Sequence, residues 1–465
     1  MFPCLGRSGL ILLLSVLVAC SLPPGFGDGG FAQYGAAHAQ DDDDDDGDDD
    51  DDGGSVRSGG DRDRQMRAPR PANPAATRRM AAAPDAAPRP ANAPDEIVVT
   101  DLAAADLALL LAEGFAVIED FTLTEVALTL HRLRIPPGLT LIAARDRVRA
   151  QPSGTTGDFN HYYRSEQAGP EAAVAEPCTH LNCRALAQIG WPADRAALEG
   201  CRVTVPVGVI DTGINRDHEN LTAARIEVIR LADDALDPSL AVHGTAVVSL
   251  LAGRADGRAP GLVPEAPLIA VDVFGRAGGD ERAGVVALIR ALDVLASRSV
   301  RVINMSLSGP PNVALEAALM RITGPGGALV LAAAGNGGPE AGPAYPAGYG
   351  PVVAVTAVDG RDRIYRRAQR GPHLDLAAPG VGIWSATSLT GVKAKTGTSF
   401  AVPFATAAAA VLASRAPAPT PAAMAGALGV MVRDIGAPGA DEVFGAGLLA
   451  LDRLCATDLL AVQGE

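Results

Sequence analysis

From about Val203 onward, nearly continuous apolar runs alternate with segments of helical pattern, and this alternation constrains the fold more than any other feature of the chain. Strands that alternate with helices form a mostly parallel sheet with helices on both faces. The predicted strands cover 205–210, 268–274, 300–306, 328–334 and 352–358. The predicted helices cover 243–252, 281–297 and 312–322, and a long Ala-rich helix begins at Ser399. In such an α/β fold, sites form beyond the carboxyl ends of the strands.

Residues 1–39 have the features of a secretory signal. Arg7 precedes an apolar run, Leu10–Cys20, which is shorter than the roughly 20 residues of a membrane-spanning helix. Two endings remain open, because Leu17–Cys20 resembles a bacterial lipoprotein box whereas Ala37–Ala39 resembles an ordinary signal-peptidase site. We therefore expect export to the periplasm, cell envelope or extracellular space, and the first ending would add membrane attachment through a lipidated Cys20.

Residues 40–95 are predicted to be a disordered linker. Eleven Asp lie within 41–52, and a segment rich in Arg, Pro and Ala follows, so the stretch buries too little apolar surface to offset its ordering entropy. Leaving out these Asp raises the formal charge from −15 to −4, so the rest of the chain has no electrostatic footprint for nucleic acid. The Asp tract could bind calcium loosely, but it lacks the mixed ligands and turns of a dedicated site.

Residues 96–165 are predicted to form a small α/β module. Strand patterns cover 96–100, 115–121 and 128–135, and helical patterns cover 101–113 and 139–150. The remaining residues, 166–465, would form the larger domain with the mostly parallel sheet.

Four cysteines follow the signal region: Cys178, Cys183, Cys201 and Cys455. In an exported protein their default state is disulfide-bonded, and four cysteines allow three pairings. A zinc site at Cys178, His180 and Cys183 is the alternative, but this spacing matches no common structural zinc pattern.

Two candidate catalytic residues stand at the edges of predicted elements. Asp211 ends the first apolar strand in the sequence Asp-Thr-Gly, and His243, followed by Gly-Thr, begins an apolar helix. An aspartic protease also uses Asp-Thr-Gly after a strand, but a single chain of that kind needs a second such triplet, which this sequence lacks. Each residue alone could be structural, as a turn Asp or a buried His.

A hydroxyl and an amide complete the constellation. Ser399 begins a helix, where free backbone N–H groups and the helix dipole favour developing negative charge, although an N-cap Ser has the same position. Asn336 follows a strand that ends in small residues, and its NH2 group is the donor that an oxyanion needs, although a turn Asn is the simpler alternative. Together with Asp211 and His243, these residues are predicted to lie on one edge of the sheet.

These four blocks resemble the signature blocks of subtilisin-like serine proteases in both order and spacing, and the resemblance covers about 191–455. It implies a subtilisin-like fold and a triad of Asp211, His243 and Ser399, with the Ser399 backbone N–H and Asn336 as the oxyanion hole. It also implies polypeptide substrates and an acyl-enzyme intermediate.

The resemblance extends to the substrate-binding residues and to the module. Substrate contacts are expected from the following residues: Ser306, Leu307, Ser308, Ala333, Gly335 and Ala344. The pocket they line carries no carboxylate, so we expect an apolar residue before the scissile bond. The module 96–165 resembles the family's propeptide, which implies that it is the enzyme's own chaperone and temporary inhibitor, with processing after about Arg164.

The chain departs from the family pattern at a few positions. Phe400 and Phe404 stand where Met and His are usual in the serine helix, and Ser308 replaces a common Gly. These changes alter packing and the specificity pocket more than the chemistry. Structural calcium occurs in the family, but no loop of this chain has acids that we could assign as ligands, and no metal or cofactor site is predicted.

Two other classes of function remain open. One is a catalytically inactive, exported binding protein on the same fold. The other is a surface scaffold in which the Asp-rich and Arg-rich segments carry the function and the fold is a support.

Overall fold

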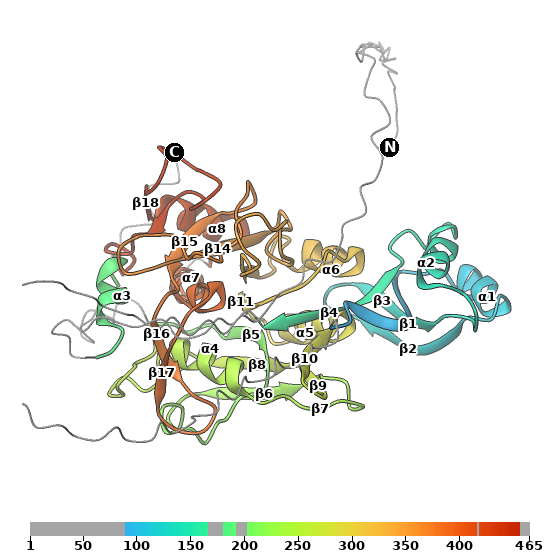
Figure 1. The fold of residues 1–465 in the computed structure, drawn as a ribbon, viewed down its shortest axis with the longest axis horizontal. Coiled ribbons are helices and arrows are strands. Elements are labelled where there is room, and N and C mark those ends of the chain that lie inside the picture. Colours follow the sequence, from blue (N-terminus) through green and yellow to red (C-terminus); the bar gives the residue numbers. More distant parts are fainter. Residues whose placement is uncertain (1–88, 166–179, 192–201, 416–417, 456–465) are drawn as a thin grey trace, which may run out of the picture. The chain divides into compact units, whose positions relative to one another are not determined.

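The computed structural model describes residues 89–165, 180–191, 202–415 and 418–455, which belong to one compact unit. Figure 1 shows the arrangement of its helices and strands. The predicted signal region with Cys20, nearly all of the predicted linker, Cys178 and Cys201 lie outside the described residues. None of the described helices is both long enough and apolar enough to cross a membrane.

A nine-stranded sheet forms the centre of the larger domain, with the order β18-β19-β15-β14-β13-β11-β5-β8-β6. All neighbours along it are parallel except β18 and β19. The strands are β5 (Val207–Asp211), β6 (Ile226–Arg230), β8 (Leu268–Asp272), β11 (Val302–Met305), β13 (Leu329–Ala333), β14 (Val352–Val358), β15 (Leu376–Pro379), β18 (Val432–Arg433) and β19 (Leu448–Leu449).

Helices cover both faces of this sheet, because successive strand residues enter different hydrophobic cores. In β13, Leu329 and Leu331 join the core under α4 (Val242–Ala252), α7 (Thr398–Ala413) and α8 (Pro421–Val430). Val330 and Ala332 join the core under α5 (Val285–Ser297) and α6 (Val313–Ile322). The prediction of a mostly parallel sheet between helices is therefore confirmed.

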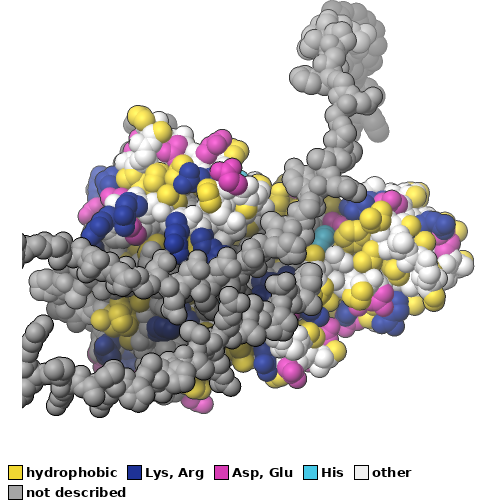
Figure 2. All heavy atoms as spheres, viewed as in Figure 1, with side chains coloured by type: hydrophobic (Ala, Val, Ile, Leu, Met, Phe, Trp, Pro, Cys, Tyr) yellow, Lys and Arg dark blue, Asp and Glu magenta, His cyan; other side chains and the backbone are white. Residues whose placement is uncertain are grey.

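The first strand of the module, β1 (Asn92–Thr100), begins before the predicted strand 96–100, and the module has the sheet order β2-β3-β1-β4. Its other elements are α1 (Ala104–Ala112), β2 (Ala116–Leu123), β3 (Leu128–Arg134), α2 (Leu141–Arg149) and β4 (Asp158–Ser165). Apolar side chains of α1 and α2 remain exposed, among them Leu109 and Ile142, and hydrophobic side chains show over these helices in Figure 2. Because a small domain buries little surface by itself, docking on the larger domain contributes to the stability of the module.

The strand β4 also belongs to the larger domain. It pairs antiparallel with β10 (Asp280–Gly284) and with β12 (Leu307–Ser308), so a single eight-stranded sheet continues from the module into β9 (Gly275–Ala277) and β7 (Asp237–Pro238). The predicted helix 281–297 is wrong at its start, because 280–284 is strand β10 and α5 begins only at Val285. Pairing with β4 and β9 overrides the helix propensity of these residues.

Two smaller elements complete the described chain. A hairpin of β16 (Ile383–Ala386) and β17 (Val392–Lys395) precedes α7, and the short helix α3 (Cys183–Gln188) precedes β5 in the chain. The backbone N–H of Leu451 donates to the carbonyl oxygen of Ile189, which ties the end of the described chain to the residues after α3.

Candidate active site

Asp211 is the last residue of β5, which lies inside the sheet between β11 and β8. Its side chain is almost fully buried, and Oδ1 accepts hydrogen bonds from the backbone N–H of Thr212 and from Nδ1 of His243, both at 2.7 Å. The structure therefore brings together the carboxylate and the imidazole that were predicted to act together. The bond also sets the tautomer, because an N–H at Nδ1 leaves the lone pair of the neutral ring on Nε2.

Gly244 allows α4 to begin against the loop that follows β5. A Cβ at Gly244 would lie only 2.3 Å from the carbonyl oxygen of Thr212, and the N–H of Gly244 donates to Oγ1 of Thr212 at 2.8 Å. Glycine is therefore required here, and the backbone contact holds the preceding residue, His243, against Asp211. Nε2 of His243 is buried and has no hydrogen-bond partner among the described residues, so it can receive a proton.

Ser399 lies in the first turn of α7 and is fully buried. Its Oγ donates to the carbonyl oxygen of Ser306 at 3.1 Å, and Oγ of Ser306 donates to the carbonyl oxygen of Ser399 at 2.9 Å. The ring centroids of Phe400 and His243 are 5.6 Å apart, so the start of α7 contacts the start of α4. The hydroxyl of Ser399 is bonded to Ser306 rather than to the imidazole.

Asn336 lies three residues after the end of β13 and faces the start of α7. Its Oδ1 accepts hydrogen bonds from the backbone N–H and from Oγ1 of Thr398, both at 3.0 Å. Because a backbone N–H can only donate, these bonds identify the amide oxygen and orient the NH2 group away from Thr398. The amide is thus held by the residue that directly precedes Ser399.

Two of the six predicted substrate-binding residues pair with the end of the module. Leu307 and Ser308 pair with Ser165 and Arg164 of β4, while Ser306 contacts Ser399 as described above. Ala333 is fully buried at the end of β13.

The wall of the predicted pocket includes a residue that the sequence analysis missed. A Cβ at Gly335 would meet both the Gln369 side chain and Ala344, so these three residues are neighbours. The backbone N–H of Gln369 donates to the carbonyl oxygen of Gly335 at 3.1 Å.

Three titratable groups near the triad were also missed. Burial and the neighbouring Asp211 raise the pKa of Asp272, against the effect of Arg230 at 2.7 Å. Burial also raises the pKa of Glu281, whose carboxylate accepts a hydrogen bond from the backbone N–H of Leu240 at 2.6 Å. The third group is Lys395, where burial lowers the pKa to about 8.

Two of these groups had a signal in the sequence. Asp272 lies inside a predicted strand as the only charged residue among apolar neighbours, and its position at the end of β8 matches that of Asp211 on β5. Lys393 and Lys395 are the only lysines of the chain, and they stand just before Ser399.

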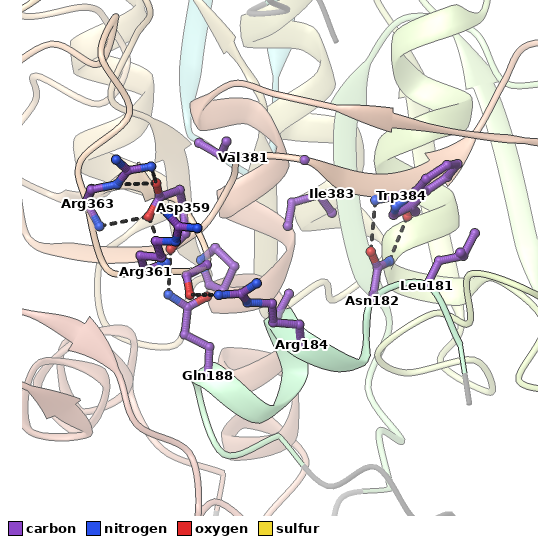
Figure 3. A pocket seen from close by; sticks show the side chains of 14 residues that line it. Leu181, Asn182, Arg184, Gln188, Asp359, Arg361, Arg363, Val381, Ile383 and Trp384 are labelled. Atoms are coloured by element: carbon purple, nitrogen blue, oxygen red, sulfur yellow. Dashed lines mark hydrogen bonds and ion pairs between the residues drawn. The ribbon is translucent and has the colours of Figure 1, made fainter. Parts of the chain in front are cut away.

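A cavity of about 330 Å³ between α3 and the residues after β14 and β15 contains none of the predicted catalytic residues. Figure 3 shows hydrogen bonds that join its walls, from Asn182 to the backbone of Trp384 and from the side chain of Gln188 to the carbonyl oxygen of Asp359. These bonds identify a packing seam apart from the triad. Within the described ranges, no cluster of three or more His, Cys, Asp or Glu could hold a metal ion.

Comparison with known proteins identifies the family. Residues 203–447, about half of the chain, match the model of the subtilase family. The chain belongs to the subtilase family of subtilisin-like serine proteases. This membership confirms the resemblance drawn from the four sequence blocks.

Individual subtilases are similar over about half of this chain. Subtilisin DY of Bacillus licheniformis is 31% identical over 231 residues, which are 48% of this chain and 82% of that protein. The minor extracellular protease Epr of Bacillus subtilis is 28% identical over 53% of this chain, but the match spans only 37% of Epr. The major intracellular serine protease of the same species is 31% identical over 45% of this chain and 68% of its own length. Extracellular and intracellular enzymes are thus both among the relatives.

A solved structure is similar over a larger share of the chain. Fervidolysin from Fervidobacterium pennivorans, a keratinolytic enzyme related to subtilisin, superimposes with a TM-score of 0.64. The match covers 78% of this chain and 61% of the fervidolysin chain at 21% identity, which supports the fold alone.

Proposed function

We propose that the protein is a serine endopeptidase in which Asp211, His243 and Ser399 form the catalytic triad. The observation that carries this proposal is the 2.7 Å bond between Asp211 and His243, together with a buried Nε2 that has no partner among the described residues. Ser399 Oγ attacks the peptide carbonyl while Nε2 of His243 takes its proton and later gives it to the leaving amine. Asp211 holds the tautomer and stabilises the imidazolium.

The oxyanion of the tetrahedral intermediate would be bound by the backbone N–H of Ser399 and the side-chain NH2 of Asn336. The orientation of the Asn336 amide by Thr398 supports this role, because it is set before a substrate binds. A rotation of the Ser399 side chain from Ser306 toward His243 would complete the reactive arrangement.

Peptide substrates would bind as a strand between β10 and β12, where β4 lies in this structure. Ser306, Leu307 and Ser308 would contact the substrate backbone, and Ala333, Gly335 and Ala344 would line the pocket for the residue before the scissile bond. We expect that residue to be apolar. A peptide library that is cut mainly after Arg or Lys would overturn this part of the proposal.

The module would act as the propeptide, with boundaries of 96–165 for the module and 166–465 for the catalytic domain. The position of β4 beside β12 supports inhibition by the module, with the chain cut after about Arg164. Expression of the wild type and of Ser399→Ala tests self-processing. A shorter wild-type product and an uncut variant are expected, and products of equal size would remove the propeptide role.

The chain would act outside the cytoplasm, after removal of the signal region 1–39 or with a lipid on Cys20. Cys183 and Cys455 are disulfide-bonded, which supports an oxidising compartment. Fractionation of expressing cells tests the location, and labelling with a radioactive fatty acid distinguishes the lipoprotein from the free form.

An activity-based probe tests the proposed enzyme against an inactive scaffold on the same fold. A fluorophosphonate reacts only with an activated serine, so it should label the wild type and should not label Ser399→Ala or His243→Ala. A wild type that stays unlabelled after removal of the module would favour the scaffold.

A further inference from the structure

The end of the module occupies the groove between β10 and β12, where a substrate strand would bind. Tyr163 of β4 pairs with Ala283 of β10, and Arg164 pairs with Ser308 of β12. Tyr163 is fully buried, and its hydroxyl donates to the carbonyl oxygen of Pro310 at 2.9 Å. The side chains of β4 therefore report which peptide side chains the neighbouring strands can accept.

Arg164 makes a two-point ion pair with Asp280, the first residue of β10. Its Nε lies 2.9 Å from Oδ1 and its Nη2 lies 3.0 Å from Oδ2 of Asp280. The side chain of Asp280 is 10% exposed and that of Arg164 is 26% exposed, so water screens the pair only in part. Nη2 also donates to the carbonyl oxygen of Pro90 at 2.8 Å, a contact that a separate peptide would lack.

Asp280 stays ionised while it binds Arg164. Burial acts to raise its pKa, but the hydrogen bonds from Arg164 and Arg282 outweigh burial and hold the pKa below the usual value. Arg282 uses one nitrogen, Nη1, at 2.9 Å from Oδ2, while its guanidinium stacks over the ring of Tyr162 at 4.1 Å. A carboxylate has about four lone-pair positions, so Asp280 can accept a second guanidinium beside Arg282.

We propose that Asp280 is a specificity-determining residue that selects peptide substrates with arginine at the position of Arg164. This inference rests on the proposed endopeptidase function and adds a substrate class to it. Arginine is preferred to lysine because two parallel N–H groups match the two carboxylate oxygens, whereas an ammonium meets them as a single point. Leucine or glutamine at this position would leave Asp280 without the second partner, and glutamate would be repelled.

The test uses quenched fluorescent peptides with the sequence of residues 160–170 and Arg, Lys, Gln or Glu at the position of Arg164. For the wild type, kcat/KM should be about tenfold higher for Arg than for Gln, which corresponds to one partly exposed charge-assisted pair. Asp280→Asn should reduce the ratio of Arg to Gln to within about twofold. Asp280→Lys should make the Glu peptide a better substrate than the Arg peptide. Where a peptide is not cut, its competitive inhibition constant against labelled casein gives the same ratio.

A matched control and an activity probe separate the possible failures. Asp256→Asn makes the same change in an exposed ion pair with Arg254, and it should keep the wild-type ratio. If the protein reacts with a fluorophosphonate but shows an Arg/Gln ratio near one, or the same ratio in Asp280→Asn, the role of Asp280 is refuted and the protease function stands. If the probe does not label the protein and no peptide is cut, the proposed function itself fails.

Discussion

Substitution of Lys395 by methionine should stabilise the protein at neutral pH. Lys395 is 8% exposed on β17, and its amine lies 6.0 Å from the centre of the Phe400 ring. Burial, and secondarily the charge of Lys393, lowers the pKa of Lys395 from 10.5 to about 8. The folded protein therefore holds an ammonium at pH 7 in a position that favours the neutral amine.

The size of the effect follows from the shift in pKa. A lowering of the pKa from 10.5 to about 8 reduces the free energy of unfolding at pH 7 by about 3 kcal/mol, because each pKa unit corresponds to about 1.4 kcal/mol. The folded pKa lies below the unfolded one, so the unfolded chain binds more protons between pH 8 and 10.5. The free energy of unfolding of the wild type should therefore rise across this window, and below pH 8 the full cost is present.

Methionine has a similar length and does not titrate. Lys395→Met should raise the free energy of unfolding at pH 7 by about 1–3 kcal/mol, the lower figure allowing for the contacts that the amine makes. At pH 10 most of this gain should be gone, because the wild-type amine is then neutral in the folded state.

Urea unfolding at pH 7 and pH 10 measures the effect, in a Ser399→Ala background that prevents autolysis. The change in unfolding free energy between the two pH values should be smaller for Lys395→Met than for its parent, and packing effects cancel in this difference. Lys393→Met, at an exposed position two residues away, removes only the secondary cause of the lowered pKa, so it should reduce the pH dependence much less than Lys395→Met does. Equal pH dependence of Lys395→Met and its parent would refute the reasoning.

Three further substitutions test the site and the module. Asn336→Ala should lower kcat about 10²–10³-fold with little change in KM in steady-state peptide kinetics, the size of loss seen when subtilisin itself lacks this donor. Gly244→Ala would place a Cβ 2.3 Å from the Thr212 carbonyl oxygen, so it should abolish labelling by the fluorophosphonate probe and lower the free energy of unfolding by about 1–3 kcal/mol. Normal labelling and an unchanged Tm would contradict this prediction. Asp293→Ala removes a carboxylate that accepts hydrogen bonds from two backbone N–H groups of the turn 124–127, at 2.8 and 3.1 Å. The cut module should therefore dissociate about tenfold faster in size-exclusion assays, and an equal rate of dissociation would count against a role of Asp293 in holding the module.

The sequence could predict the pair of Asp211 and His243 because both residues stand where a regular element ends or begins. Carboxyl ends of parallel strands share one edge of the sheet, so an aspartate directly after an apolar strand reaches that edge wherever the strand lies in the order. A histidine at the start of a helix reaches the same edge, because the chain leaves a strand there and returns through a helix. The shared edge follows from this topology, whereas the 2.7 Å contact depends on the packing of α4 against the loop after β5.

The strand β10 shows what local pattern could not predict. Residues 280–284 contain Glu, Arg and Ala, which favour helix, but they form a strand because β4 and β9 supply hydrogen-bond partners from both sides. The same pairing places Asp280 beside Arg164, 116 positions away in the chain. The burial of Lys395 also depends on tertiary packing, because the hairpin of β16 and β17 packs against α4 and the amine of Lys395 lies near the Phe400 ring of α7.

The strand β4 pairs with strands of both the module and the larger domain, and these pairs determine how the module is released. A cut in the chain beyond β4 removes only the covalent link, while β4 remains paired with β1 in the module and with β10 and β12 in the larger domain. Release of the module with β4 must therefore break the strand pairs with β10 and β12 together with the ion pair of Arg164 and Asp280, unless β4 itself is cut. A free peptide forms the pairs with β10 and β12 but has no module sheet behind it, so it binds more weakly and leaves faster. The same groove can thus hold its own module tightly and still turn over short substrates.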